Sequence, residues 1–199
     1  MRFNALVHVR LRVSVSDAAG NSATSSKAMT VTKTDTFTSN STSFATVTGL
    51  TVNITPSATS SKVFVMVDIK IGTEHGDSDF QIKLVRGSSD VYVGDAAVNR
   101  TSSSMGTSSY GMPVNDTDGQ YYLKQISLNY LDSPSTTSAT TYKIQLRNYS
   151  GDTSRYYTIN RTENDASVAY NQRGTSKILL MEVLSLIHIS EPTRLLSIS

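Results

Sequence analysis

The densest group of chemically active side chains lies between residues 74 and 79. Glu74, Asp77 and Asp79 place three carboxylates around Gly76. Hard cations such as Ca²⁺ bind several carboxylate or carbonyl oxygens, so these three residues are candidate metal ligands. The same composition is typical of a solvated loop between two strands, which is the interpretation we favour. We therefore expect no resident metal ion and no cofactor.

A second acidic stretch, residues 115–119, superficially resembles a calcium-binding loop. It departs from that pattern because Val114 stands at the first ligand position and Gln125 replaces the closing glutamate. The chain has no cysteine, and His75 has no second histidine nearby, so zinc and thiol chemistry are not expected. We predict no catalytic residue and no enzyme activity. A polysaccharide depolymerase stays an alternative, because its two carboxylates pair in space and not in sequence.

The segment from Asn99 to Gln120 is the strongest candidate for recognition. It is long, rich in serine and glycine, and lacks apolar periodicity, which is typical of a functional or mobile loop. Tyrosine and asparagine among small residues supply rigid contact area and adaptable hydrogen bonds at binding surfaces. A loop without a partner is the alternative. The candidate receptor-binding residues are Arg100, Tyr110, Met112, Asn115, Asp116 and Asp118.

The bulk composition argues against several classes of partner. The 199 residues carry a net charge of +2 with the charges interspersed, so we expect neither nucleic acid nor a membrane surface as a partner. No apolar stretch reaches the roughly 20 residues that span a bilayer, so membrane insertion is not expected. Abundant threonine and valine, with ten tyrosines, favour strands over helices.

Apolar residues occupy every second position in a series of short segments. The strongest runs from Lys62 to Ile71, with valine and isoleucine at the odd positions. Phe64 and Met66 lie on its opposite face, which either stays inside one sandwich or meets a neighbouring subunit. Such segments, separated by turns and some long connections, predict an all-β fold: an antiparallel, jelly-roll-like β-sandwich of about eight strands with little helix. Four tyrosines are expected to pack across strands: Tyr149, Tyr156, Tyr157 and Tyr170.

Two changes of pattern divide the chain. Residues 1–32 alternate around a turn at 17–21, which predicts an N-terminal β-hairpin. Residues 33–183 contain the remaining strand segments and form the predicted sandwich domain. The string from Val13 to Ala23 resembles the final hairpin of bacterial immunoglobulin-like repeats. We therefore interpret residues 1–32 as the remnant of such a repeat.

A series of short blocks follows in order through the second part of the chain. Among them are FATVTGLTVNITP at 44–56, LDSP at 131–134 and GTSKILLMEV at 174–183. Together they resemble a domain of bacteriophage tail fibres and related virion structural proteins. The resemblance implies a distal, trimeric jelly roll of the tumour-necrosis-factor/C1q type that contacts the host surface. It carries no set of catalytic residues.

Residues 184–199 do not continue this pattern. The stretch from Leu184 to Arg194 back-translates into DNA that resembles a transposase adapter used for sequencing libraries. We therefore expect residues 184–199 to be non-native and His188 to have no role. We also expect the native sequence to end near Val183 and the gene to be of metagenomic origin.

These observations lead to one functional prediction and its alternatives. We predict a non-enzymatic virion protein, a distal tail-fibre domain that forms a homotrimer and binds a glycan or protein of the host surface. The main alternative is an extracellular bacterial adhesin or carbohydrate-binding module. Flanking genes for tail and baseplate proteins would favour the first, and cell-wall anchors would favour the second.

Overall fold

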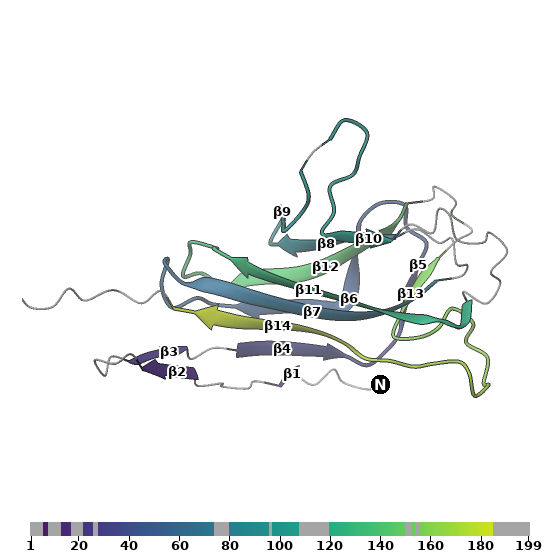
Figure 1. Ribbon diagram of the computed structural model, residues 1–199, viewed down its shortest axis with the longest axis horizontal. Helices are drawn as coiled ribbons and strands as arrows, with labels where there is room; N and C mark the ends of the chain where they lie inside the picture. Colours follow the sequence, from purple (N-terminus) through teal and green to yellow (C-terminus); the bar gives the residue numbers. More distant parts are fainter. Residues whose placement is uncertain are drawn as a thin grey trace, which may run out of the picture.

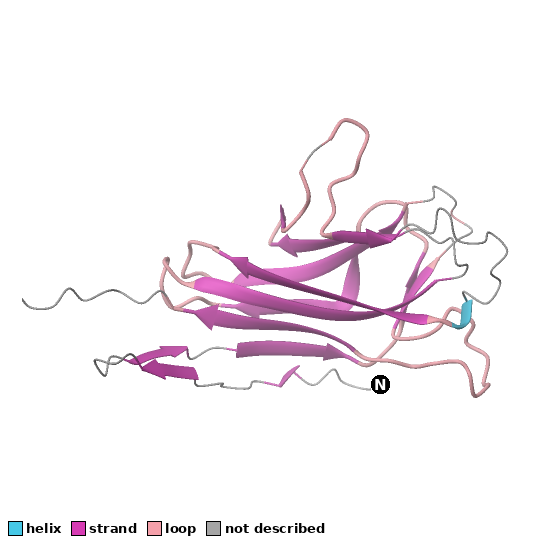
Figure 2. Cartoon of the chain, in the orientation of Figure 1, coloured by secondary structure: helices cyan, strands magenta, loops and turns pink. Residues whose placement is uncertain are grey.

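The computed structural model describes residues 6–7, 13–16, 22–25, 28–73, 80–95, 97–107, 120–149, 153 and 156–184. Within these ranges the regular structure is β, apart from a short helical turn at residues 120–121 (Figure 2). No helix in the described ranges has the length and apolar character needed to cross a membrane. The strands are β1 (Leu6–Val7), β2 (Val13–Ser16), β3 (Ser22–Ser25), β4 (Ala28–Lys33), β5 (Phe37–Ser39), β6 (Ala45–Ile54), β7 (Lys62–Thr73), β8 (Phe80–Arg86), β9 (Ser89–Val91), β10 (Met105–Thr107), β11 (Leu123–Asp132), β12 (Thr140–Asn148), β13 (Tyr157–Ile159) and β14 (Ser176–Val183).

Two antiparallel sheets stack face to face (Figure 1). The larger sheet has seven strands: β1, β4, β14, β7, β13 and β5, with β11 on the other side of β7. The smaller sheet has five: β10, β8, β12 and β6, with β9 also paired to β8. These two layers confirm the predicted antiparallel β-sandwich.

The connectivity is that of a jelly roll. Three strands are each interrupted and carry two labels: β4 with β5, β9 with β10, and β13 with β14. β4 pairs with β14 and β5 pairs with β13, while β9 and β10 both pair with β8. Without the N-terminal β1, β2 and β3, counting each interrupted strand once gives eight strands in chain order. The larger sheet then holds the first, eighth, third and sixth, and the smaller sheet holds the second, seventh, fourth and fifth. Two such four-strand sets in one sandwich are the pattern of a jelly roll.

The core lies between the sheets and is built from alternate side chains. On β7 the odd-numbered residues from Val63 to Ile71 are buried, and on β12 the even-numbered residues face them from the opposite sheet. Because successive side chains of a strand point to opposite faces, this alternation fixes which residues enter the core. The largest fully buried apolar residues are Tyr142, Tyr157, Phe80, Leu50, Ile69, Ile71, Ile82, Leu84, Ile144, Leu146 and Ile159.

A buried asparagine fills the break in the interrupted edge of the larger sheet. Asn160 follows β13 with a φ of 65° and is fully buried. Its Nδ2 donates to the carbonyl oxygens of Lys33 at 2.8 Å and Asp35 at 3.0 Å. The Ser176 hydroxyl donates to its Oδ1 at 2.6 Å. The side chain therefore satisfies backbone groups that a continuous ladder would otherwise pair.

The N-terminal strand β1 extends the larger sheet, whereas β2 and β3 form a separate two-stranded sheet. β1 pairs with β4 through Leu6 and Val31, and β2 pairs with β3 as a hairpin. β4 itself pairs along its whole length with β14. The expected boundary between residues 32 and 33 therefore falls inside a strand of the sandwich. The interpretation of the N-terminal residues as a remnant of another repeat stays a prediction.

The outer face of the larger sheet is apolar at one end. Phe64 and Met66 of β7 point away from the core and are only partly exposed. Their cross-strand neighbours are Met181 and Leu179 on β14, and Leu131 opposite Phe64 on β11. Leu131 is 46% exposed. The second face of this strand therefore lies outside the sandwich core.

Candidate ligand-binding site

One of the residues predicted to contact a receptor lies in a projecting loop of the smaller sheet. The loop, residues 92–104, leaves the sheet after β9 and returns to it at β10 (Figure 1). Arg100 is exposed there, and its backbone N–H donates to the carbonyl of Ala97 at 2.6 Å. The other predicted receptor-binding residues lie outside the described ranges, as do the three candidate metal ligands. They are Tyr110, Met112, Asn115, Asp116 and Asp118, and Glu74, Asp77 and Asp79.

The base of this loop is held by specific contacts. The ring of Tyr92 stacks on Tyr130 of β11 with centroids 5.0 Å apart. On the other limb, the Ser104 N–H donates to the carbonyl of Ile82 at 2.8 Å, and its hydroxyl accepts from the Leu84 N–H at 2.9 Å. Both limbs are therefore fixed to strands, which presents the loop in a defined position.

Arg147 connects the loop to the outer face of the smaller sheet. It occupies an odd position on β12, whose even positions face the core. Its Nε donates to Oε1 of Gln81 at 2.8 Å, and one terminal nitrogen donates to Oγ1 of Thr101 at 2.6 Å. Gln81 is its cross-strand partner on β8, and Thr101 follows Arg100 in the loop. The guanidinium is therefore oriented by two neutral partners from separate elements.

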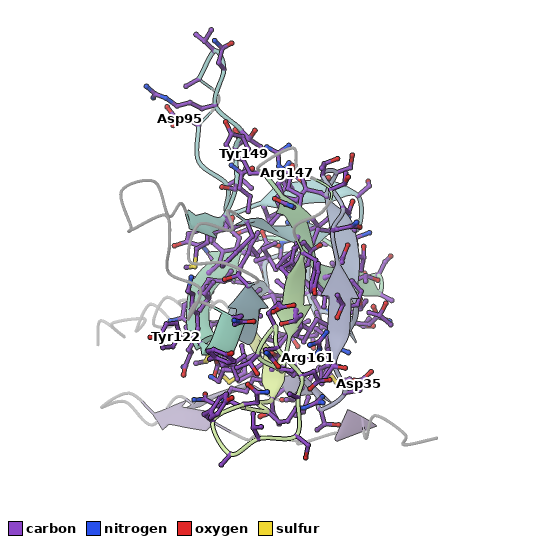
Figure 3. The ribbon with its side chains drawn as sticks, turned by 90° about the vertical axis from the view of Figure 1, so that its right-hand side faces the viewer. Asp35, Asp95, Tyr122, Arg147, Tyr149 and Arg161 are labelled. Atoms are coloured by element: carbon purple, nitrogen blue, oxygen red, sulfur yellow. The ribbon has the colours of Figure 1, made fainter. Side chains whose placement is uncertain are left out.

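Two aromatic rings flank this guanidinium. The Arg147 carbon Cζ lies 5.1 Å from the ring centroid of Phe44 and 5.5 Å from that of Tyr149. The Lys83 ammonium lies 4.4 Å from the same Phe44 ring, and both cations are within cation–π range. Figure 3 shows Arg147 and Tyr149 together at the base of the loop that carries Asp95.

These residues define what we call the Arg147 surface. Tyr149 is 56% exposed there. Lys83 forms an ion pair with Asp90, whereas no carboxylate in the described part of the chain pairs with Arg147. The surface therefore combines a cation that has no carboxylate partner among the described residues, an accessible ring, and amide and hydroxyl groups. Its members are Phe44, Gln81, Lys83, Thr101, Arg147 and Tyr149.

A different arginine closes the opposite end of the sandwich. Nη1 of Arg86 donates to both carboxylate oxygens of Asp132 at 2.8 Å, and the Tyr142 hydroxyl donates to Oδ2 at 2.6 Å. Asp132 is only 3% exposed. Burial is the main cause that raises the pKa of Tyr142 above its usual value, and the hydrogen bond to Asp132 raises it further. The three residues join β8 and β12 to β11, and we call them the buried clasp.

A second buried carboxylate also has an internal role. Glu182 on β14 accepts hydrogen bonds from both the backbone N–H and the hydroxyl of Ser57, in the loop between β6 and β7. Asp132 and Glu182 are the two carboxylates among the buried polar residues of the described ranges. Both therefore fasten elements of the sandwich together.

A shallow hollow of about 420 Å³ lies in the loop between β13 and β14. Asp165 and Arg173 form an ion pair beside it, and both side chains are exposed. The Asn171 amide is tied back to the carbonyl of Ala166 at 2.7 Å. Because its two charges neutralise each other, this hollow offers less for a ligand than the Arg147 surface does.

Sequence reasoning identified Arg100 but missed Arg147 and Phe44. The outward position of Arg147 on a strongly alternating strand was the available signal, because a charged residue there must face away from the core. Phe44 is separated from it by about a hundred positions, and only the pairing of β12 with β6 and β8 brings the two together. Of the four tyrosines expected to pack, Tyr157 is buried and donates to the Leu146 carbonyl at 3.1 Å. Tyr149 and Tyr170 are exposed.

No family model matches the chain, and no curated protein matches it. Among solved structures, the chain is similar to the VP2 protein in a subviral particle of infectious bursal disease virus. The two share 13% sequence identity with a TM-score of 0.34. The similarity covers 87% of this chain and 43% of the viral protein, so the chain spans less than half the length of that neighbour.

Proposed function

We propose that this chain is a non-enzymatic virion structural protein, the distal domain of a phage tail fibre, and that it binds the host cell surface. The observation that carries the binding role is the position of Arg147, held outward between Phe44 and Tyr149 beside an anchored loop. Oriented polar groups with an accessible aromatic ring are the features of recognition surfaces. The resemblance of residues 33–183 to tail-fibre domains supports the proposed virion location.

The proposed assembly is a homotrimer that buries the apolar end of the larger sheet's outer face. Phe64, Met66, Leu179 and Met181 form neighbouring pairs there, and Leu131 adjoins them. Contiguous apolar side chains outside a core favour burial against another surface. A closed cyclic assembly would cover the same patch on every copy. This face is separate from the Arg147 surface, which lies on the smaller sheet.

Two measurements on the full chain test the proposal. Light scattering should give three times the chain mass of 21.6 kDa. Leu131→Lys should reduce that mass to one copy, because it places a charge in the apolar patch, whereas Thr48→Lys on the exposed face of β6 should leave the trimer intact. A well-folded monomer in the unsubstituted chain would refute the trimeric fibre tip.

Binding to whole cells tests the receptor role. Fluorescently labelled chain should bind some members of a panel of bacterial strains and saturate with concentration. Failure to bind any strain in the panel would count against host attachment.

An extracellular bacterial carbohydrate-binding module is the second candidate, because the Arg147 surface suits a polysaccharide ligand equally well. The genes beside this one separate the two. Tail and baseplate genes support the fibre, and secretion or cell-wall anchoring genes support the module. A stable monomer would also favour the module.

A further inference from the structure

We propose that the Arg147 surface binds acidic glycans and that Arg147 holds their carboxylate or phosphate groups. This inference rests on the proposed host-surface function and names the chemistry of the ligand. It also places the contact on the outer face of the smaller sheet, together with the base of the projecting loop.

The guanidinium is prepared for an anion before any ligand arrives. Its hydrogen bonds to Gln81 and Thr101 use neutral oxygens, so they orient the group without cancelling its charge. The rings of Phe44 and Tyr149 restrict it further. A planar guanidinium that is already oriented loses little freedom on binding, and its donors match the oxygens of carboxylate and phosphate.

The neighbouring side chains suit a sugar polymer. The Tyr149 ring is accessible to the apolar face of a sugar. Further along β12, Gln145 donates to the Thr46 hydroxyl at 3.4 Å, and Lys143 follows on the same outward side. Four residues of extended strand separate Arg147 from Lys143 by roughly 13 Å. The face therefore places two cations along one line with hydroxyl and amide groups between them.

Acidic side chains are placed differently on the two outer faces. On the larger sheet, Asp68 forms an ion pair with Lys70 at 2.8 Å and lies opposite Lys177. On the smaller sheet, Lys83 is paired with Asp90, while Arg147 and Lys143 have no carboxylate partner among the described residues. An anionic ligand is therefore favoured over a neutral one on the smaller sheet.

Titration calorimetry on the full chain tests the ligand class with three probes. These are an oligogalacturonate, which carries carboxylates, its methyl ester, which is neutral, and a glycerol phosphate oligomer. We expect at least one anionic probe to bind at least tenfold more tightly than the ester. The comparison between the two anions identifies the source of the charge. Equal affinity for the ester, or no binding of either anion, would overturn the proposal.

A matched pair of arginine substitutions tests the assigned residue. Arg147→Lys should weaken binding of the anionic probe at least tenfold, because an ammonium cannot keep both neutral hydrogen bonds and still present a planar pair of donors. Arg173→Lys, at an exposed ion pair in another loop, should change the affinity less than twofold. Unchanged affinity in Arg147→Lys would refute the assignment.

Cell binding separates this inference from the function on which it rests. If the chain binds bacterial cells and Arg147→Lys binds equally well, host attachment stands and the acidic-glycan site is wrong. If the chain binds the acidic probe in an Arg147-dependent way but binds no cells, the glycan site stands and host attachment is wrong.

Discussion

Two arginines at opposite ends of the smaller sheet have opposite roles. Arg86 reaches into the end of the sandwich and contacts a buried carboxylate, whereas Arg147 lies on the outer face between two aromatic rings. Both are on strands that pair with each other, and both make short hydrogen bonds. The difference lies in their partners, because Asp132 neutralises Arg86 while Gln81 and Thr101 leave the charge of Arg147 in place.

This difference separates stability from recognition within one sheet. The ion pair of Arg86 with the buried Asp132 joins two layers, and the loss of one partner leaves the other charge without compensation. A partly exposed cation with neutral partners, such as Arg147, adds little stability but keeps its electrostatic attraction for a ligand. The two regions should therefore respond to different substitutions and different solution conditions.

Removal of the Asp132 carboxylate should have the largest effect. Asp132→Ala leaves Arg86 and the Tyr142 hydroxyl without their shared acceptor, so we expect a loss of about 3 kcal/mol in the free energy of unfolding. Urea denaturation followed by circular dichroism measures it. Asp165→Ala, which breaks the exposed pair with Arg173, is the control and should cost less than about 0.5 kcal/mol. Similar losses for the two variants would show that the clasp contributes no more than a surface pair.

A smaller effect is expected when only the Tyr142 hydroxyl is removed. Tyr142→Phe keeps the ring in the core and leaves Asp132 paired with Arg86, so the loss at pH 7 should be about 1.5 kcal/mol. Glycan affinity at the Arg147 surface should not change. Weaker glycan binding in this variant would show that the two regions are coupled.

The same substitution should alter the dependence of stability on alkaline pH. The folded protein raises the pKa of Tyr142 above its usual value of 10.0, so above about pH 10 the folded state retains a proton that the unfolded state loses. Stability is therefore fully present below pH 10 and decreases as pH rises further. Tyr157, whose pKa is also raised mainly by burial, contributes to the same decrease. Urea midpoints from pH 8 to 11 should fall less steeply in Tyr142→Phe, and an unchanged slope would contradict the assignment.

Salt should affect the two regions differently, with the smallest change in the clasp. Exposed charges are screened over roughly 10 Å at 0.1 M salt, whereas buried pairs are screened much less. Raising sodium chloride from about 0.05 to 0.5 M should weaken binding of an acidic oligosaccharide severalfold, and should move the urea midpoint of the free protein only slightly. A salt-independent affinity would show that the ligand is not held by its charge.

Period-two alternation was sufficient to predict the sandwich. It placed Val63 to Ile71 on one face of the longest strand, and the structure buries them. The predicted number of about eight strands is found from β4 onward when each interrupted strand is counted once, and β1, β2 and β3 add three more. The interruptions were harder to foresee, because the break at Asn160 depends on hydrogen bonds to Lys33 and Asp35, more than a hundred positions earlier.

The candidate site was predictable only where it is local in sequence. Arg100 was identified because it lies in a long polar loop between strands. Arg147 and Phe44 were not, because each looks like an ordinary member of a strand segment until the strands are paired. The loop residues from Tyr110 to Asp118 lie outside the described ranges, so their role stays a prediction.

By itself, the sequence determined which side of each strand faces the core, because side chains alternate and only one set is apolar. Only the tertiary structure decided which strands became neighbours. That choice joined Arg86 with Asp132 and Arg147 with Phe44, two contacts between residues far apart in the chain. Strand pairing at long range depends on the closure of loops and on the fit of the whole core, and neither is recorded in a local pattern.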